Sequence, residues 1–399
     1  MKPAVWVARL PWGLVAIALA LLSLSWLGIA RSEELADGPG RYARRQMIWT
    51  LLALAAMFVA TLPSYRILCR WSYAVFALAL ALLVLVYFFP PVHGTHRWLR
   101  LAGLSLQPSE FGKIGLVLAL ARYLMYRANY RRFRGLCMPL MLTLLPVVLV
   151  LREPDLGTSL VFIPVLFAML FAAGARKRDL AALALCGMLT LPALWTQMSR
   201  EQRSRVTALF EQTLPGERPT DDGYHLHQAK QLLALGGVWG SWLAGEPVDD
   251  RAVYRLPEDH TDFIFTVLGE RFGWLGGFGV LFLVVLLSWR ALAVAESTRE
   301  PFGRLVAVGV VALFAVQSLI NTAMTVGLLP VTGLSLPLVS YGGSGLVAHC
   351  LALGLVLNIG LRPGYEVAGE PFSFARRGRL AGRGRRRLEV RGYNSRGRQ

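Results

Sequence analysis

The sequence predicts an all-α polytopic membrane protein with about ten transmembrane helices and both termini in the cytoplasm. Of its 399 residues, 55% are hydrophobic and only 17% are charged, whereas soluble domains carry charge on roughly a quarter of their residues. Ten mostly apolar runs approach the length of about twenty residues that a bilayer core requires. The arginines lie between these runs, so the net charge of +18 reflects membrane topology and does not indicate nucleic-acid binding.

The predicted spans follow one another along the chain with one long interruption. They cover residues 12–29, 46–62, 71–89, 109–126, 136–151, 156–173, 180–198, 263–289, 304–325 and 345–361. The first run lacks a convincing small-residue cleavage site and further spans follow at once, so we interpret it as a retained helix. The four cysteines lie in or beside apolar runs without paired spacing, which predicts packing roles and no disulfide or zinc site.

The placement of basic residues favours an even number of spans, because cytoplasmic loops carry an excess of lysine and arginine. With Lys2 and Arg9 inside, the inside loops include the basic segments 127–134 and 176–178, while the outside loop 325–344 has no charge. The first outside segment is the exception, since its arginines exceed its acids: Arg31, Arg41, Arg44 and Arg45 against Glu33, Glu34 and Asp37. The even count still fits best.

Two parts of different composition make up the chain. Residues 1–370 form the predicted ten-helix transmembrane domain, which includes a large extracytoplasmic loop at 199–262. Residues 371–399 are rich in arginine and glycine and contain too little apolar surface to fold alone. We interpret them as a disordered cytoplasmic tail held near anionic lipid, at about 1 kcal/mol per basic residue. RNA binding by this tail is the alternative.

Four clusters of polar residues map to the predicted outer face, where charge is costly unless it is paired, hydrated or used. The first contains Arg97 and Trp98, followed by a helix start at Pro108. Glu110 and Lys113 are three residues apart, so they share one helix face and can pair. Arg97 and Lys113 are candidates to bind an anionic headgroup, with Trp98 as interfacial anchor or sugar-stacking platform. A helix cap with a snorkelling lysine is the alternative.

The second and third clusters are acidic. Asp155, in the stretch Asp-Leu-Gly-Thr, has the pattern of an ordinary helix N-cap, so we interpret it as structural. The long loop ends in Glu258, Asp259, His260 and Asp262, directly before an apolar span. A structureless loop of this length is uncommon unless it is functional, and acids with a histidine at this place predict a proton-transfer site. N-capping of the following helix is the alternative for Asp262.

The fourth cluster, at 327–344, is rich in glycine and proline. Irregular backbone at membrane depth is tolerated only where it lines a protein cavity. Its backbone N–H groups and hydroxyls, including Ser340 and Ser344, suit a phosphate or sugar ligand. A re-entrant structural loop is the alternative.

These clusters contain, in order, HRWLRLAGLSLQPSEFGK, REPDLGTSLV, GGVWG, LPEDHTDFIFTVLGE and NTAMTVGLLPVTGLSLPLVSYGGSG. Together they resemble the SEDS family of peptidoglycan glycosyltransferases, which includes FtsW, RodA and SpoVE. The resemblance covers about residues 97–358, and the TGLSLP stretch looks more like FtsW or SpoVE than RodA. It implies a ten-helix fold, in agreement with the span count.

The resemblance implies a glycosyltransferase that polymerises lipid II at the outer face of the bacterial cytoplasmic membrane. The family's essential aspartate falls on Asp262, which we expect to act as general base on the 4-hydroxyl of N-acetylglucosamine, a contribution of about 10²–10⁴-fold. Arg97 and Lys113 are expected to neutralise the pyrophosphate leaving group, with Glu110 and Glu258 as orienting residues. The other expected substrate contacts are Trp98, His260, Ser340 and Ser344.

The expected partners are a class B penicillin-binding protein and proteins of the divisome or elongasome, with no nucleic acid. Mg²⁺ or Mn²⁺ could share the neutralisation of the pyrophosphate, although the sequence shows no dedicated metal cage. Two rival functions remain open: a lipid II transporter and a non-catalytic scaffold for the penicillin-binding protein. The chain departs from the family where Arg271 follows Glu270 in place of a second acid, which predicts a local ion pair, and where Gly345 replaces a common serine.

Overall fold

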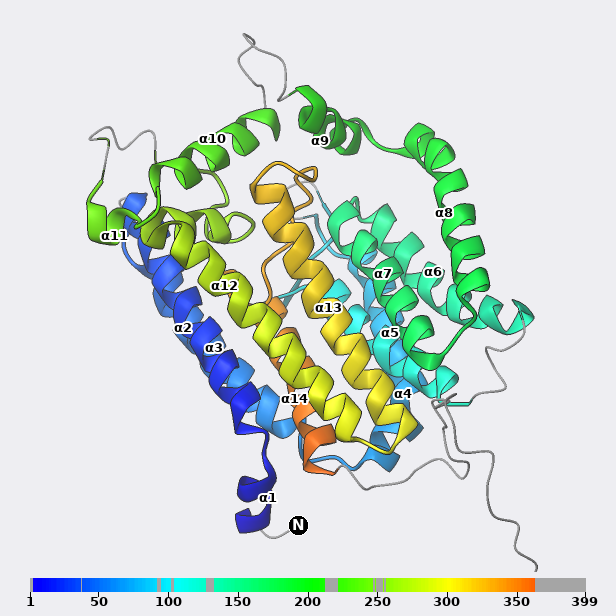
Figure 1. Ribbon diagram of the computed structural model, residues 1–399. Helices are drawn as coiled ribbons and strands as arrows, with labels where there is room; N and C mark the ends of the chain where they lie inside the picture. The colour runs from blue at the N-terminus through cyan, green and yellow to red at the C-terminus, as the bar shows by residue number, and fades with distance from the viewer. Residues whose placement is uncertain are drawn as a thin grey trace, which may run out of the picture.

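The computed structural model describes residues 3–36, 38–91, 95–101, 104–126, 133–211, 222–246, 248, 254 and 256–362, so the predicted tail at 371–399 lies outside the described residues. Within this part of the chain, long helices run side by side (Figure 1). They are α2 (Trp12–Leu35), α3 (Arg41–Val59), α4 (Tyr65–Leu85), α5 (Pro108–Leu124), α6 (Cys137–Arg152), α7 (Leu156–Ala173), α8 (Lys177–Gln197), α12 (Ile264–Ser297), α13 (Pro301–Thr325) and α14 (Gly343–Leu361).

Each predicted span falls on one of these helices, which confirms the all-α polytopic fold. Within the described residues, seven helices are long and apolar enough to cross a membrane, and α6 is a shorter apolar helix. Several helices extend beyond the predicted spans. The helix α2 continues to Leu35 because its charged end is buried, with Arg31 only 3% exposed. A span predicted from apolar residues ends at the first charged residue. The helix itself continues where that residue is buried and paired.

The core lies where α5, α13 and α14 pack among the other helices. The closest neighbours are α14 with α3, α4 with α5, and α13 with α7. Small residues allow this proximity: a Cβ at Gly309 of α13 would lie only 2.6 Å from Val117 Cγ1 of α5. The helix α8 differs, because none of its residues is buried and it packs chiefly on α7. Figure 1 shows it set apart from the bundle.

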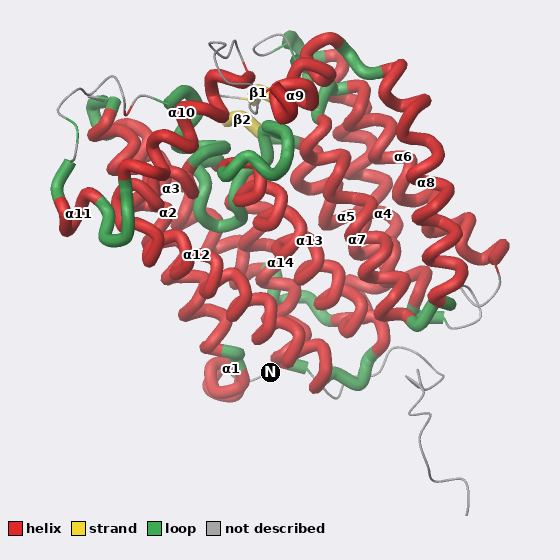
Figure 2. Tube along the Cα trace, turned by 45° about the horizontal axis from the view of Figure 1, so that its top comes forward, coloured by secondary structure: helices red, strands yellow, loops and turns green. Residues whose placement is uncertain are grey.

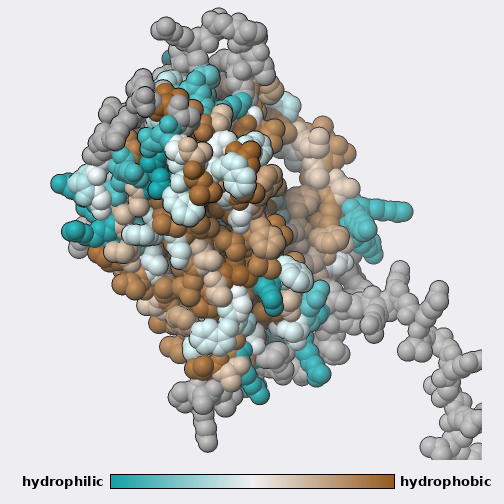
Figure 3. Space-filling view, turned by 60° about the vertical axis from the view of Figure 1, so that its left-hand side comes forward, coloured by the Kyte–Doolittle hydropathy of each residue, from teal (hydrophilic) through white to brown (hydrophobic). Residues whose placement is uncertain are grey.

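The surface has the distribution expected in a bilayer. Apolar side chains cover the middle of the face shown in Figure 3, and hydrophilic ones gather mainly toward its ends. Long exposed apolar side chains on α12, such as Phe278, Phe282 and Trp289, would be costly in water and are natural in lipid. The chain is therefore a multi-pass membrane protein.

The smaller elements gather at one end of the bundle, opposite to α1 (Pro3–Arg9) and the end of α14 (Figures 1 and 2). They include the antiparallel pair β1 (Leu99–Leu101) and β2 (Leu104–Leu106), and the helices α9 (Arg200–Glu211), α10 (Asp222–Leu235) and α11 (Ser241–Ala244). The long segment predicted as a loop at 199–262 therefore contains the helices α9, α10 and α11. Two short 3-10 helices, Val86–Phe88 and Phe133–Leu136, complete the described elements.

The GGVWG segment between α10 and α11 fixes this assembly to the bundle. Gly240 and Gly273 pack backbone against backbone, so a Cβ at either would clash with the opposite chain. Gly273 has a φ of 68° and forms the kink of α12, a conformation that glycine adopts without strain. The N–H of Trp274, freed at this kink, donates to Gly237 O at 3.0 Å. These glycines therefore hold α10 and α11 at a defined position on α12.

Candidate active site

Asp262 lies in the turn that leads into α12, at the outer end of the bundle. The turn is closed by the N–H groups of Asp262 and Phe263, which donate to Glu258 O at 3.1 and 3.4 Å. Its other side is held by Asn321 of α13, whose Nδ2 donates to Asp262 O at 2.8 Å and to Leu334 O at 2.6 Å. Two segments far apart in the sequence thus fix the backbone of Asp262.

The carboxylate of Asp262 does not cap α12. The N-cap residue is Phe263, and no side chain caps this helix. Within the described part of the chain, no hydrogen bond engages the half-buried Asp262 carboxylate. The structure therefore excludes the alternative that the sequence left open, and leaves Asp262 free for another role.

The surroundings of Asp262 favour its protonated form. Burial, first, and then the nearby charge of Glu258 raise its pKa to about 7, while Arg205 and Arg97 act in the opposite direction. A general base is most effective when its pKa lies near the working pH. Asp262 combines this property with a carboxylate that makes no hydrogen bond within the described part of the chain.

Arg97 is held by the turn between α6 and α7. Its Nε donates to Glu153 O at 2.9 Å, and its Nη2 donates to Pro154 O. Asp155 caps α7 by accepting from Thr158 N at 3.0 Å, which confirms the predicted N-cap. Because Arg97 and Asp155 both influence the pKa of Asp262, the structure brings the first three predicted clusters together.

Glu153 is a site residue that the sequence interpretation missed. Its side chain is fully buried, and neither carboxylate oxygen has a hydrogen-bond partner among the described residues. Burial, and secondarily the charge of Asp155, raise its pKa to about 8. Glu153 is therefore neutral at pH 7. Its place between Arg152 and Pro154 gave no sign of this, because burial comes from the fold.

A second polar cluster lies inside the bundle. Lys113 Nζ contacts Glu110 Oε1 and Gln317 Oε1, both at 2.8 Å, which confirms the predicted pairing of Glu110 with Lys113. His349 Nε2 lies 3.5 Å from the same Gln317 oxygen and 3.7 Å from Glu110 Oε2. The cavity beside them has a volume of only about 10 Å³, room for at most one water molecule. The sequence interpretation missed Gln317 and His349, which come from distant helices.

The other residues that were predicted to contact the substrate lie in different parts of the structure. Ser340 Oγ accepts from Leu336 N at 2.7 Å, and Ser344 Oγ accepts from Gln107 N at 3.2 Å, so both hydroxyls stabilise loops. Glu258 is exposed and accepts from Thr261 Oγ1 at 3.1 Å. Trp98 is half-buried next to Arg97 in sequence. These sites stay predictions for substrate contact.

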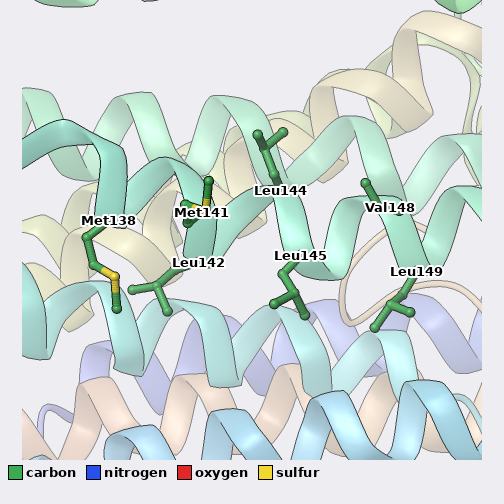
Figure 4. Close-up of a pocket in the computed structure, with 7 residues that line it drawn as sticks. All are labelled: Met138, Met141, Leu142, Leu144, Leu145, Val148 and Leu149. Atoms are coloured by element: carbon green, nitrogen blue, oxygen red, sulfur yellow. The ribbon is translucent and has the colours of Figure 1, made fainter. Parts of the chain in front are cut away.

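Two further features bear on ligands. Among the described residues, no group of three or more His, Cys, Asp or Glu side chains is arranged to hold a metal ion. A groove of about 500 Å³ runs along α6 (Figure 4), lined by Met138, Met141, Leu142, Leu144, Leu145, Val148 and Leu149. Its lining contains no titratable side chain and is largely exposed, with Met141 at 67%, so it offers no group for proton transfer.

Fold and site together define a class: a multi-pass helical membrane protein with a carboxylic acid of raised pKa, Asp262, in a turn at one end of its bundle. Comparison with known proteins identifies the family. The model of the FtsW, RodA and SpoVE family, described as "Cell cycle protein", matches residues 8–362. The chain belongs to this family, as the sequence motifs predicted.

Curated relatives and solved structures agree with this assignment. The chain is 37% identical over 329 residues to "Probable peptidoglycan glycosyltransferase FtsW" of Geobacter sulfurreducens, covering 80% of this chain and 86% of that protein. It is 32% identical to stage V sporulation protein E of Bacillus subtilis, covering 87% and 95%.

Two solved structures share the fold. One, described as "Structural coordination of polymerization and crosslinking by a peptidoglycan synthase complex", matches with a TM-score of 0.74 at 32% identity, over 88% of this chain and 97% of that chain. The rod shape determining protein RodA of Thermus thermophilus matches with a TM-score of 0.66 at 30% identity, over 89% and 97%.

Proposed function

We propose that this protein is a peptidoglycan glycosyltransferase that polymerises lipid II at the outer face of the bacterial cytoplasmic membrane, with Asp262 as general base. Relatives that carry the glycosyltransferase name support the reaction class. The observation that carries the assignment of the base is the state of Asp262: its carboxylate does not cap α12, and its pKa is raised to about 7.

The reaction is a displacement at the anomeric carbon of the donor sugar. The carboxylate of Asp262 accepts the proton of the acceptor 4-hydroxyl as its oxygen forms a bond to that carbon. The bond between the carbon and the lipid diphosphate breaks, and the electron pair leaves with the diphosphate. A hydroxyl is a poor nucleophile at neutral pH, so a positioned base contributes about 10²–10⁴-fold.

The leaving diphosphate gains negative charge, which a cation held in position stabilises. Arg97 is suited to this task because its guanidinium is anchored through backbone carbonyls and keeps its charge uncompensated by those bonds. Lys113 is buried against Glu110 and Gln317, so it must exchange one of these contacts to reach a diphosphate. Mg²⁺ or Mn²⁺, if bound with the substrate, would supply further neutralisation of the diphosphate oxygens.

The proposal includes a class B penicillin-binding protein as partner, within a divisome or elongasome. The match to a structure of a peptidoglycan synthase complex supports an assembly of polymerase and crosslinking enzyme. The proposal places the protein in the bacterial inner membrane, and the distribution of arginines along the chain supports a topology with both termini inside.

The rival functions account less well for the same residues. A lipid II transporter predicts acids and bases deep inside the spans, along a path. The buried ion pairs Glu110 with Lys113 and Arg31 with Glu270 account for those charges without using Asp262. A scaffold without catalytic activity leaves the free carboxylate of Asp262 unexplained.

The test uses the full chain in lipid nanodiscs together with its penicillin-binding protein partner and labelled lipid II. We expect glycan strands from the wild type and from the control Asp179→Asn, an acid in the first turn of α8, but none from Asp262→Ala. Strands from Asp262→Ala would overturn the catalytic assignment. Strands from no variant, with the partner present, would favour transport or scaffolding.

A further inference from the structure

Three aromatic rings from distant parts of the chain meet next to the catalytic turn. Tyr42 of α3 stacks on His260, with centroids 4.4 Å apart and an interplanar angle of 28°. Tyr341, from the loop before α14, meets the Tyr42 ring edge-on at 5.2 Å and lies 5.4 Å from the His260 ring. His260 precedes Asp262 by two residues. The cluster is therefore part of the immediate surroundings of the proposed base.

Backbone hydrogen bonds anchor Tyr42 and Tyr341, and the three rings pack on one another. The N–H of Tyr42 donates to Glu33 Oε1 at 2.8 Å, and Glu33 is itself only 5% exposed. The N–H of Tyr341 donates to His260 O at 2.8 Å. His260 Nδ1 lies 3.2 Å from Asp259 Oδ1. Because the rings are already ordered, a ligand that stacks on them would not have to restrict their motion.

The stack is buried on one side and open on the other. His260 and Tyr341 are half-buried, while Tyr42 is 41% exposed. Tyrosine combines an apolar ring with a polar hydroxyl, which lets it contact ligands with both apolar and polar parts. A pyranose ring has this character, with C–H groups on its face and hydroxyls around its edge.

The charges around Asp262 indicate which substrate part belongs here. The charged groups that influence its pKa, which are Glu258, Arg205, Asp155 and Arg97, do not include any from the aromatic cluster. The diphosphate of the donor needs cations, whereas the acceptor sugar brings an uncharged ring whose 4-hydroxyl must come within about 3 Å of the base. Charged groups touch the cluster at Tyr341, which accepts from Arg45, and at His260, which lies against Asp259. The exposed ring, that of Tyr42, is uncharged and suits the acceptor.

We propose that Tyr42 and His260, supported by Tyr341, form a binding site for the pyranose ring of the acceptor N-acetylhexosamine. The site places the 4-hydroxyl of that sugar at the carboxylate of Asp262. This assignment rests on the proposed glycosyltransferase function and adds a substrate subsite to it.

The test separates the acceptor from the donor by using a disaccharide–peptide that lacks the lipid diphosphate, so that it accepts glycan but cannot donate it. The full chain with its partner transfers labelled glycan from saturating lipid II, and the acceptor concentration is varied. Tyr42→Leu removes the ring and keeps an apolar side chain, and we expect it to raise the KM for this acceptor about tenfold, with kcat changed less than about threefold. Tyr42→Phe and Tyr42→Trp should keep the KM within about twofold.

The control is Tyr224→Leu in α10. Tyr224 is 45% exposed and lies beside His225, with ring centroids 6.2 Å apart, so it matches Tyr42 in type and exposure but belongs to another surface. We expect no change in KM from this variant. An unchanged KM in Tyr42→Leu, a loss of kcat alone, or an equal rise in Tyr224→Leu would overturn the subsite. No transfer by the wild type would instead overturn the proposed function itself.

Discussion

Asp262 and Glu270 are eight residues apart at the outer end of α12, and their surroundings are opposite. Both oxygens of Glu270 accept from Arg31 of α2, at 3.1 and 2.8 Å, and Arg31 also contacts Glu246 at 2.9 Å. The carboxylate of Asp262 has no such partner in the described part of the chain. The difference shows that a buried charge which is fully paired supports the fold, whereas one left without partners is available for chemistry.

The largest expected effect concerns Asp262, the carboxylate without a partner in this comparison. Asp262→Asn keeps the shape of the side chain and removes the base, so we expect polymerisation to fall by about 10²–10⁴-fold. Because the carboxylate makes no hydrogen bond to any residue that the structure describes, thermal unfolding should be unchanged. The measurements are the rate of glycan synthesis from lipid II and the melting temperature in detergent. Parallel loss of both would show that Asp262 is structural after all.

Loss of the ion pair between Arg31 and Glu270 should instead reduce stability. Arg31→Met leaves Glu270 buried without its counter-charge, which costs about 3–5 kcal/mol. Thermal unfolding should report this loss, and the double variant Arg31→Met with Glu270→Met should recover most of it, since a buried pair can be replaced by apolar side chains. A melting temperature unaffected by Arg31→Met would contradict the structural role of the pair.

Glu153 is a third case beside Asp262 and Glu270, because it is buried and unpaired but lies outside the catalytic turn. Its pKa is about 8 in the folded protein, well above the ordinary value, so the folded state retains a proton that the unfolded state releases. Stability contributed by this proton is present at low pH and is lost as pH rises toward 8. Glu153→Gln should therefore stabilise the protein at pH 8, by a difference on the order of 3 kcal/mol.

The contrast between pH 5 and pH 8 is the sharpest readout for Glu153. The gain in melting temperature from Glu153→Gln should disappear at pH 5, where the wild-type carboxyl is protonated in the folded state. Glu296→Gln, at an exposed acid of α12, serves as control and should show no such dependence. A gain of the same size at both pH values would contradict a buried titrating carboxyl.

The pH profile of catalysis follows from the raised pKa of Asp262. Only the ionised carboxylate accepts a proton, and its pKa is about 7, so kcat/KM should fall about tenfold per pH unit below that value and level off above it. The wild-type profile, measured with stability checked at each pH, tests this. A plateau that extends unchanged down to pH 5 would show that the base titrates at an ordinary carboxylate value.

Much of this arrangement could be predicted from the sequence, and the failures have a common cause. Apolar runs located every long helix because the bilayer imposes their length. The motif match selected Asp262, although local pattern alone left it equally suited to capping. The predicted local pair of Glu270 with Arg271 was wrong, because Arg31 lies 239 residues away in the chain and no local rule connects them.

The acids and rings that the sequence could not place are those whose roles depend on burial or on distant segments. Glu153 and His349 acquire their surroundings from the packing of several helices. Tyr42 reaches His260 and Tyr341 only through the fold. A sequence records residue types and spacings, so it indicates local caps and pairs such as Asp155 and Glu110 with Lys113, and not contacts between segments far apart.

The smallest expected effect concerns the cluster inside the bundle, where pairing is nearly complete. Lys113 satisfies Glu110 Oε1 and Gln317 Oε1 directly, while Glu110 Oε2 lacks a hydrogen-bond partner in the described residues and has only His349 near it, at 3.7 Å. His349→Met removes this weak contact and should destabilise the protein by about 1 kcal/mol. His349→Gln keeps a donor and should cost less.

Comparison with Lys113→Met decides how the cluster is held together. Removing Lys113 leaves a buried carboxylate unpaired, so the expected loss is about 3–5 kcal/mol, several times that of His349→Met. Thermal unfolding of the three variants in one detergent orders them. If His349→Met were as damaging as Lys113→Met, the imidazole would be a full partner of Glu110. Glu110 would then depend on two partners, Lys113 and His349, whereas Glu270 depends on one, Arg31.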